Sequence, residues 1–344
     1  MRRRPARRRA PLPLAGPRRR GPRRRLGHLL PAAAHAGGLG AASRGAGALK
    51  LPASLLAAAC LALAVSGVAA DAATGDPPRR LVSLAPSVTE LLFDLGLGDR
   101  VVGVTDWCRR PPAALAVAKV GGHLDPNLEA VVSLLPDLVV LEVANSEAAD
   151  GLRRLQVPFL AVEHRDVAGI LASVTQAGEA CGVPVRAAAL RDSLEARVAA
   201  VRNARADGPR PLALVVVGRD ATGGVLRDVY AAGGGTFLGE LLELAGGRNA
   251  IEGDALRYPL LSQEGLVRLA PEVVVDLAPE CADDPQRRDE LHAAWELLRD
   301  VPAVRDGRVR IVLDDAALIP GPRFVETLDL LAEALDPTWT RTGP

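Results

Sequence analysis

The chain has 344 residues, of which 49% are hydrophobic and 24% charged. That balance is typical of soluble globular proteins and excludes a chain that is disordered throughout or a polytopic membrane protein. The first 50 residues carry 14 of the 42 basic residues, so the rest of the chain holds 28 basic and 41 acidic residues, a net charge of −13. An acidic body argues against a nucleic-acid partner, because phosphate binding needs clustered Lys and Arg.

Residues 1–70 contain no Asp or Glu and are expected to be a basic leader with a signal peptide. A positive charge at Lys50 precedes the apolar run 51–70, which ends in small residues before Asp71, as a cleavable signal does. The sequence therefore predicts export to the periplasm. Three alternatives stay open: lipid attachment at Cys60, retention of the run as a membrane anchor, and a nucleic-acid-binding arm at the Arg-rich start.

Three cysteines follow the leader: Cys108, Cys181 and Cys281. None belongs to a Cys-x-x-Cys pair, so the sequence contains neither a zinc knuckle nor a thioredoxin motif. One disulfide is possible in an oxidising compartment, and the sequence does not decide whether it forms.

The first half of the body alternates short apolar strands with helices, the pattern of an α/β protein with a parallel sheet. Ser87 and Glu90 have the spacing of a capping box, which predicts a helix that starts there and stops at Gly96. Asn127 is expected to cap a second helix that runs through Leu135. Strands are expected at 81–84, 100–104 and 138–141.

The second half repeats this alternation. Ser262 is expected to cap a helix through Leu269, and Gly233-Gly234-Gly235 is expected to be a flexible approach to a cleft. Strands are expected at 212–217, 273–276 and 309–313, and further helices at 237–244, 291–298 and 324–335.

Two segments match residue by residue and indicate an internal repeat. Glu129 lies seven residues before Pro136, and Glu264 lies seven residues before Pro271, each with an apolar strand following. Residues 185–206 have a helical apolar period and would form a helix roughly 33 Å long. The expected organisation is a leader (1–70), a first lobe (79–166), connecting helices (167–206) and a second lobe (207–337), with central, mostly parallel sheets in both lobes.

Several motifs of the chain resemble those of the helical-backbone (cluster A-II, class III) substrate-binding proteins of ABC importers, in the cobalamin-binding and siderophore-binding branch. The resemblance covers residues 79–337. The motifs that carry it are Leu84-Ala85-Pro86-Ser87-Val88-Thr89-Glu90, Gly103-Val104-Thr105 leading to Pro111-Pro112, Pro126-Asn127-Leu128-Glu129, Leu135-Pro136-Asp137-Leu138-Val139 and Pro320-Gly321-Pro322-Arg323.

The resemblance implies that Glu129 and Glu264 each dock one lobe on a permease dimer, meeting Arg pockets on two equivalent subunits. Their acidic side chains would also suit the first turn of a helix, where the macrodipole favours a negative charge, and both roles can hold together.

The resemblance also implies a ligand held between the lobes. Aromatic residues in stretches bordered by Gly or Pro are expected to pack against it, with Tyr hydroxyls as polar handles. His123 is expected to pack, hydrogen-bond or ligate a metal there. The candidate ligand contacts are Trp107, His123, Tyr230, Tyr258, Asp315 and Arg323.

The function expected from these residues is periplasmic delivery of a corrinoid, such as cobalamin, to an ABC permease with its ATPase. No catalytic residue, resident cofactor or metal site is assigned, and the protein is expected to be a monomer. A ferric siderophore or haem remains the alternative ligand, because arginines lie near the candidate loops: Arg109, Arg110, Arg219, Arg227 and Arg257. A secreted enzyme using Asp106, His123 or Asp315, and a receptor for storage or signalling, also remain open.

Overall fold

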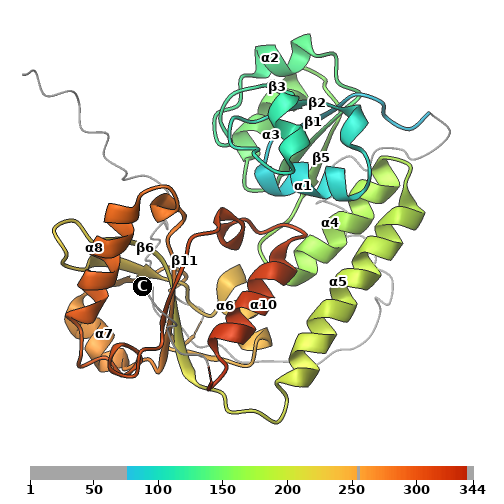
Figure 1. Cartoon of the computed structure of the whole chain (residues 1–344). Coiled ribbons are helices and arrows are strands. Elements are labelled where there is room, and N and C mark those ends of the chain that lie inside the picture. Colours follow the sequence, from blue (N-terminus) through green and yellow to red (C-terminus); the bar gives the residue numbers. More distant parts are fainter. Residues whose placement is uncertain (1–75, 254–255, 339–344) are drawn as a thin grey trace, which may run out of the picture. The chain divides into compact units, whose positions relative to one another are not determined.

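The computed structural model describes residues 76–253 and 256–338, all within one compact unit, Ser66–Pro344. The expected leader, signal peptide and Cys60 lie outside the described residues. The chain folds as an α/β protein with two separate sheets, as the sequence predicted. Figure 1 shows the two sheets with α4 and α5 running beside each other in the stretch of chain that connects them.

The first sheet has five strands in the order β3-β2-β1-β4-β5, and every neighbouring pair is parallel. Helices α1 and α4 pack on one face of this sheet, and α2 and α3 pack on the other. We call this sheet and helices α1–α3 the first lobe. Its elements are β1 (Leu81–Ser83), α1 (Pro86–Asp94), β2 (Val101–Val104), β3 (Ala118–Lys119), α2 (Leu128–Ser133), β4 (Leu138–Glu142), α3 (Ser146–Arg154) and β5 (Phe159–Val162).

The second sheet has the order β11-β10-β6-β7-β9, with β8 pairing off this path with β6. Strands β11, β10, β6 and β8 are parallel, whereas β7 runs antiparallel to β6 and β9. This sheet and helices α6–α10 form the second lobe. Its elements are β6 (Leu212–Asp220), β7 (Arg227–Ala231), α6 (Phe237–Leu244), β8 (Arg248–Asn249), β9 (Leu260–Leu261), α7 (Gln263–Leu269), β10 (Val273–Leu277), α8 (Pro285–Glu296), α9 (Pro302–Arg305), β11 (Val309–Val312) and α10 (Phe324–Ala334).

The connecting segment contains α4 (Val167–Ala180) and the 21-residue helix α5 (Pro184–Ala204). Near its start, Arg186 of α5 donates to the carbonyl oxygens of Leu95 and Gly96 in the first lobe, at 3.4 and 3.3 Å. Further along, Arg197 makes two hydrogen bonds from Nε to the carboxylate of Asp329 on α10, at 3.0 and 3.1 Å. The helix is therefore tied to one lobe near its start and to the other along its second half.

The capping box expected at Ser87 and Glu90 is wrong. Helix α1 begins at Pro86, with Ala85 as an N-cap that makes no side-chain hydrogen bond. Proline is favoured in the first helical turn, so it places Ser87 inside that turn rather than ahead of it. The hydroxyl of Ser87 and the carboxylate of Glu90 bond to other parts of the molecule, described below. The stop at Gly96 is confirmed, with φ of 70°.

The two matched helices, α2 and α7, have the same ends. Asn127 and Ser262 both cap them by accepting a hydrogen bond from the backbone N–H three residues on. The residues just before the matched prolines, Leu135 and Ala270, both adopt the left-handed conformation, with φ of 47° and 46°. Left-handed backbone is uncommon for residues with a Cβ, so its recurrence at equivalent positions supports the repeat.

Two details of the second half differ from the expectations. Gly233 is tightly packed rather than a flexible approach, because a Cβ there would lie 2.1 Å from the carbonyl oxygen of Leu256. The thiols of the first and second lobes and of the connecting segment are all buried and free, so no disulfide joins Cys108, Cys181 and Cys281.

A buried charge lies in β10, an inner strand of the second sheet. Asp276 on β10 is fully buried, accepts a hydrogen bond from Trp295 Nε1 at 2.8 Å and lies 3.3 Å from Nε of Arg219. Burial raises the pKa of Asp276 to about 6, although the guanidinium and the indole N–H act in the opposite direction. Desolvation of the carboxylate therefore outweighs its pairing.

We expect the contribution of Asp276 to stability to fall as the pH rises from 4 to 6, because the folded state holds the Asp276 proton more tightly than the unfolded chain does. Asp276→Asn carries no charge and keeps an acceptor for Trp295, so it should lack this loss, which amounts to up to about 3 kcal/mol. Urea unfolding between pH 4 and 7 measures the difference, with Asp289→Asn on the exposed surface as the control. If Asp276→Asn is instead less stable than wild type at pH 7, the ion pair with Arg219 outweighs the cost of burying the carboxylate.

Candidate functional site

The first sheet has a topological switch point beside β1. The connections from β1 to β2 and from β3 to β4 place their strands on opposite sides of β1. In open parallel sheets, ligands bind in the crevice at the carboxyl ends of the strands at such a point. Ser87 follows the end of β1, Glu142 ends β4, and His164 follows β5. The sequence prediction missed all three, because none belongs to a local motif that differs from an ordinary helix start or strand end.

Glu142 is the centre of this polar cluster. Ser87 donates a short hydrogen bond from its hydroxyl to Oε1 of Glu142. Nδ1 of the buried His164 lies 3.7 Å from Oε1, and Nε2 of His123 lies 4.0 Å from Oε2. His164 is held from behind by Ser173, whose hydroxyl lies 2.8 Å from Nε2. One carboxylate therefore joins groups that follow three different strands of the first lobe, β1, β3 and β5.

The pKa of Glu142 reflects these neighbours. Burial would raise it, but the nearby imidazoles of His164 and His123 and the hydroxyl of Ser87 outweigh burial and hold the pKa below its usual value of 4.5. Glu142 is therefore ionised at neutral pH and places a negative charge at the switch point.

His123 is positioned by backbone contacts. Its Nδ1 lies 3.0 Å from the carbonyl oxygen of Leu84, and its own carbonyl oxygen accepts a 2.7 Å hydrogen bond from the buried Asn145. A carbonyl oxygen only accepts, so Nδ1 carries a proton, and in the neutral form of the ring the lone pair lies on Nε2. Within residues 76–253 and 256–338, no group of three or more His, Cys, Asp and Glu is arranged to hold a metal ion.

A cavity of about 400 Å³ lies between the lobes. It brings together two of the six predicted ligand contacts, Asp315 and Arg323, with residues of α1 and of the loop after β2. Trp107, His123, Tyr230 and Tyr258 are not part of its lining. The lining residues are Glu90, Asp94, Arg109, Arg110, Pro111, Pro112, Asp315 and Arg323.

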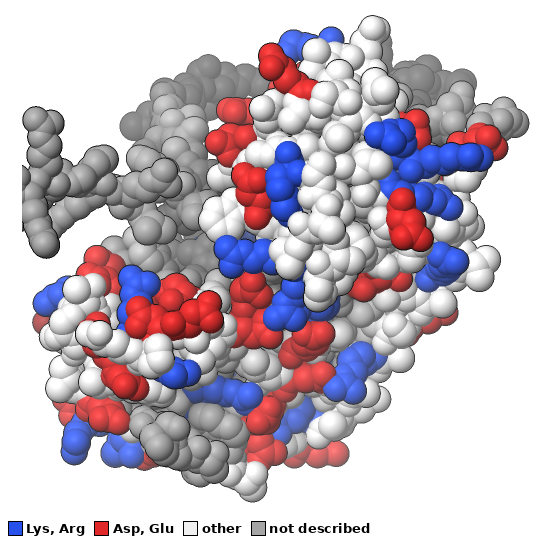
Figure 2. Space-filling view, turned by 45° about the horizontal axis from the view of Figure 1, so that its top comes forward, with Lys and Arg blue, Asp and Glu red and all other residues white. Residues whose placement is uncertain are grey.

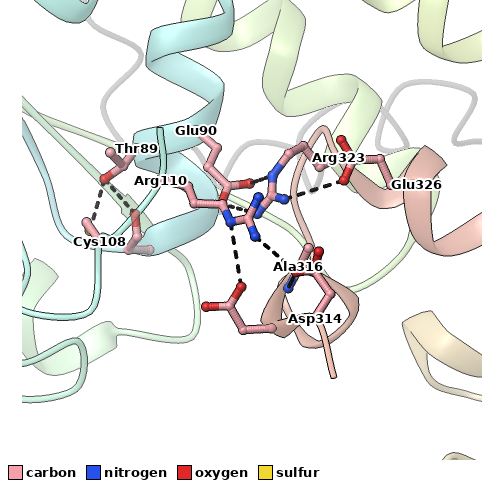
Figure 3. Close-up of polar contacts among 10 residues, drawn as sticks. Thr89, Glu90, Cys108, Arg110, Asp314, Ala316, Arg323 and Glu326 are labelled. Atoms are coloured by element: carbon pink, nitrogen blue, oxygen red, sulfur yellow. Dashed lines mark hydrogen bonds and ion pairs between the residues drawn. The ribbon is translucent and has the colours of Figure 1, made fainter. Parts of the chain in front are cut away.

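The charged residues of this cavity pair across the lobes (Figure 3). Arg323 of the second lobe donates from Nε and Nη2 to the two carboxylate oxygens of Glu90, at 2.9 and 2.7 Å. Arg110 of the first lobe lies 3.3 Å from Asp314 and 3.7 Å from Asp315. Arg323 and Asp315 therefore act as contacts between the lobes in this structure, and the Glu90 partner is a residue that the sequence prediction assigned to a helix cap.

Asp94 lies at the end of α1 in the same cavity lining. Desolvation raises its pKa to about 6, helped by the negative charges of Glu90 and Glu326 and opposed by Arg323. This carboxyl group is therefore more readily protonated than a free aspartate, and its position at a helix C-terminus does nothing to favour the charged form.

The predicted aromatic contacts have different environments. Trp107 follows β2, where its side chain is 58% exposed. The prediction that Tyr230 lies in a loop is wrong. It lies in β7, opposite Gly218 of β6 and Leu260 of β9. The alternation of Val229 and Ala231, both buried, with Tyr230 was the missed strand signal.

Tyr258 packs partly into the core. Burial raises the pKa of its hydroxyl, and the charge of Arg257 acts in the opposite direction. This tyrosine therefore supports the second lobe from within, in addition to any contact that it makes with a ligand.

The second lobe has a polar contact at the corresponding edge of its sheet. Arg219, near the end of β6, donates to the carbonyl oxygen of Leu277 at 2.9 Å and to the carboxylate of Glu280 at 2.6 Å. Its side chain is only 2% exposed. Arg219, one of the five arginines that favoured a ferric siderophore or haem as the alternative ligand, is thus enclosed within the second lobe.

Glu129 and Glu264 both lie exposed in the first turn of their helices. An apolar side chain that is also exposed follows each of them by three residues: Val132 at 37% and Val267 at 38%. The two lobes therefore present the same pair of side chains at equivalent positions.

On the face drawn in Figure 2, Lys and Arg side chains lie interspersed with Asp and Glu. Among the described residues, no helix has both the length and the apolar character that crossing a membrane requires.

Glu142→Gln tests the polar cluster. A group whose pKa is lowered on folding stabilises the folded state above its unfolded pKa of 4.5, and this contribution is lost as the pH falls below that value. We therefore expect the variant to lose about 1–3 kcal/mol of unfolding free energy at pH 7 and to approach wild type near pH 3. Chemical denaturation at both pH values measures this, and Glu163→Gln, a more exposed neighbour, is the control. An equal loss at both pH values would contradict the assignment.

Comparison with known proteins gives a consistent result. The family model described as periplasmic binding protein matches residues 81–316. The chain is 30% identical over 268 residues to the uncharacterized ABC transporter substrate-binding lipoprotein YvrC of Bacillus subtilis, covering 76% of this chain and 81% of that protein. It is 31% identical over 271 residues to a cobalamin-binding protein of Halobacterium salinarum, covering 76% and 70%.

Among solved structures, the periplasmic haem-binding protein RhuT from Roseiflexus sp. RS-1 superimposes with a TM-score of 0.64 at 27% identity, covering 76% of this chain and all of the other. This structural similarity agrees with the two-lobed fold described above. The chain therefore belongs to the periplasmic binding protein family and is a substrate-binding component of an ABC transporter rather than an enzyme.

Proposed function

We propose that this protein receives a corrinoid outside the cytoplasmic membrane and delivers it to an ABC permease. The observation that carries the choice of ligand is the 31% identity to a cobalamin-binding protein over 271 residues. The ligand would lie between the lobes, at the carboxyl ends of both sheets.

The pairing of the crevice charges supports a ligand with little net charge. Arg110 is paired with Asp314 and Asp315, and Arg219 is paired with Asp276 and Glu280. An anionic ferric siderophore would need several free guanidinium groups. Arg110 is engaged with carboxylates, Arg219 is enclosed in the second lobe, and Arg109 is the one arginine of the cavity lining without an ion pair among the described residues. The exposed ring of Trp107 offers a flat apolar surface for a corrin ring.

Haem is the second candidate, favoured by the geometry of His123. Its Nδ1 is bonded to a backbone carbonyl, and its Nε2 is 4.0 Å from Glu142, beyond hydrogen-bond distance. An imidazole fixed in this way is suited to bind a haem iron through Nε2.

Calorimetric titration of the purified protein with cyanocobalamin, haemin and ferric siderophores separates these ligands. We expect saturable binding of cyanocobalamin, weakened about tenfold by Trp107→Ala because ring stacking is lost. The exposed apolar variant Leu297→Ala, on the second lobe, is the control. Tight binding of a ferric chelate with no response to any corrinoid would refute the proposal, and haemin binding abolished by His123→Ala would favour haem.

Delivery requires a permease dimer with its ATPase, and we propose that Glu129 and Glu264 dock the two lobes on it. Exposed carboxylates at equivalent positions of a repeat suit two equivalent permease subunits, because each lobe can then make the same contact. A salt bridge at the edge of such an interface would also speed association at low salt.

Replacing both residues, Glu129→Ala with Glu264→Ala, should leave ligand affinity unchanged and reduce uptake about tenfold or more, since each exposed pair contributes about 1 kcal/mol. Uptake of the labelled ligand in cells that depend on this importer measures the effect. Glu147→Ala is the matched control, because Glu147 is also an exposed first-turn acid but has no equivalent in the repeat. Unchanged uptake in the double variant would contradict docking through these residues.

We also propose that residues 1–70 direct export, with cleavage after Ala70 and lipid attachment at Cys60 as the competing form. The relative YvrC is described as a lipoprotein, and a membrane-tethered receptor would serve the same permease.

A further inference from the structure

The segment 314–323, which connects β11 to α10, belongs to the second lobe but is bonded to the first lobe. We call these ten residues the strap. It contains a short 3₁₀ helix, Asp315–Leu318, and contacts the first lobe at its start through Asp314 and Asp315 and near its end through Gly321 and Arg323.

The start of the strap is held by exposed charges. Nη2 of Arg110 lies 3.3 Å from Asp314, and Nε lies 3.7 Å from Asp315. The side chains of Arg110 and Asp314 are both 47% exposed. Pairs this open to water are screened by salt and contribute little to binding.

The end of the strap is held by a buried pair. Arg323 makes two parallel hydrogen bonds to Glu90, a bidentate arrangement that fixes the orientation of both side chains. The side chain of Glu90 is 5% exposed and that of Arg323 is 18% exposed. Removing one partner of such a pair would leave a buried charge without compensation.

The strap backbone touches the first lobe between these two pairs. A Cβ added to Gly321 would lie 3.2 Å from Cα of Ser87 and 3.4 Å from its carbonyl oxygen. Glycine therefore allows the strap to pass directly over the start of α1. This contact lies two residues before Arg323, so it reinforces the fixed end and not the exposed one.

The strap and the first lobe together line the inter-lobe cavity, which is partly open to solvent. Asp315 and Arg323 contribute its strap side, while α1 and the loop 109–112 contribute the other side. Displacing the strap would widen the opening of this cavity.

From these contacts we infer that the strap is a hinged cover over the inter-lobe cavity. Its Arg323 end stays attached to Glu90, and its Asp314–Asp315 end detaches from Arg110. The lobes can thereby admit or release a ligand at this end of the crevice while the bidentate pair keeps their alignment. The inference holds for any ligand and does not depend on the proposed corrinoid.

Hydrogen–deuterium exchange of the purified full chain tests the two ends separately. The amides of Ala317 and Ile319 report on the start of the strap, and those of Gly321 and Phe324 report on its end. All four amides donate hydrogen bonds to carbonyl oxygens of the strap. We expect Arg110→Gln to accelerate exchange at the start about fivefold and to leave the end unchanged. Glu90→Gln should accelerate exchange at both ends.

Arg109→Gln is the matched control, because Arg109 lines the same cavity and forms no ion pair among the described residues. It should leave both ends unchanged. Raising NaCl from about 0.05 to about 0.5 M should reproduce the Arg110→Gln effect in wild type and have no further effect in that variant, because only exposed pairs are screened.

The salt series keeps the test decisive even where Glu90→Gln fails to fold. Three results would overturn the inference: the same exchange rate and response at both ends of the strap, an equal effect of Arg109→Gln and Arg110→Gln, or no response of the start to salt.

Discussion

One apolar core passes through both lobes and the helices that connect them, and the rest of the structure depends on it. The same cluster of buried side chains includes Leu91 in the first lobe, Ile170 on α4, Leu194 on α5 and Leu328 in the second lobe. Because burial of apolar surface is the dominant favourable contribution to folding, separating the lobes widely would expose this cluster to water. The crevice between the lobes is therefore limited to small movements, and recognition has to come from side chains at its edges.

The polar groups in the crevice are largely matched to each other. Within the described residues, Glu90 pairs with Arg323 and Arg110 with Asp314, while Glu142 accepts a hydrogen bond from Ser87 of its own lobe. Each buried charge needs such a partner, since an unpaired one is costly in a medium of low dielectric constant. The two types of inter-lobe pair differ in burial, and this difference gives the strap one firm end and one releasable end. A site with its charges already neutralised favours a large ligand with a low net charge.

The repeat is the feature that the sequence described best. The spacing of Glu129 and Glu264 from their prolines predicted matched helices, and the structure adds matched caps and left-handed ends. Asp137 and Glu272, which follow those prolines, also have the same role, since each carboxylate accepts a backbone N–H from the start of the neighbouring strand segment. Local patterns are reliable here because caps, turns and apolar periods act between residues only a few positions apart.

The sequence by itself determined the α/β class, the two similar lobes, the long helix α5 and the exposed positions of Glu129 and Glu264. Only the tertiary structure decided the partners of the charged residues. Ser87 and Glu90 have the spacing of a helix cap, yet their side chains bond to Glu142, 55 residues away, and to Arg323, 233 residues away. Local spacing specifies which side chains can meet within one helix. The packing of the lobes specifies which distant group lies within bonding distance of each side chain. The physical reason is that a buried polar atom takes the partner that the folded backbone supplies, and that choice is absent from any short stretch of sequence.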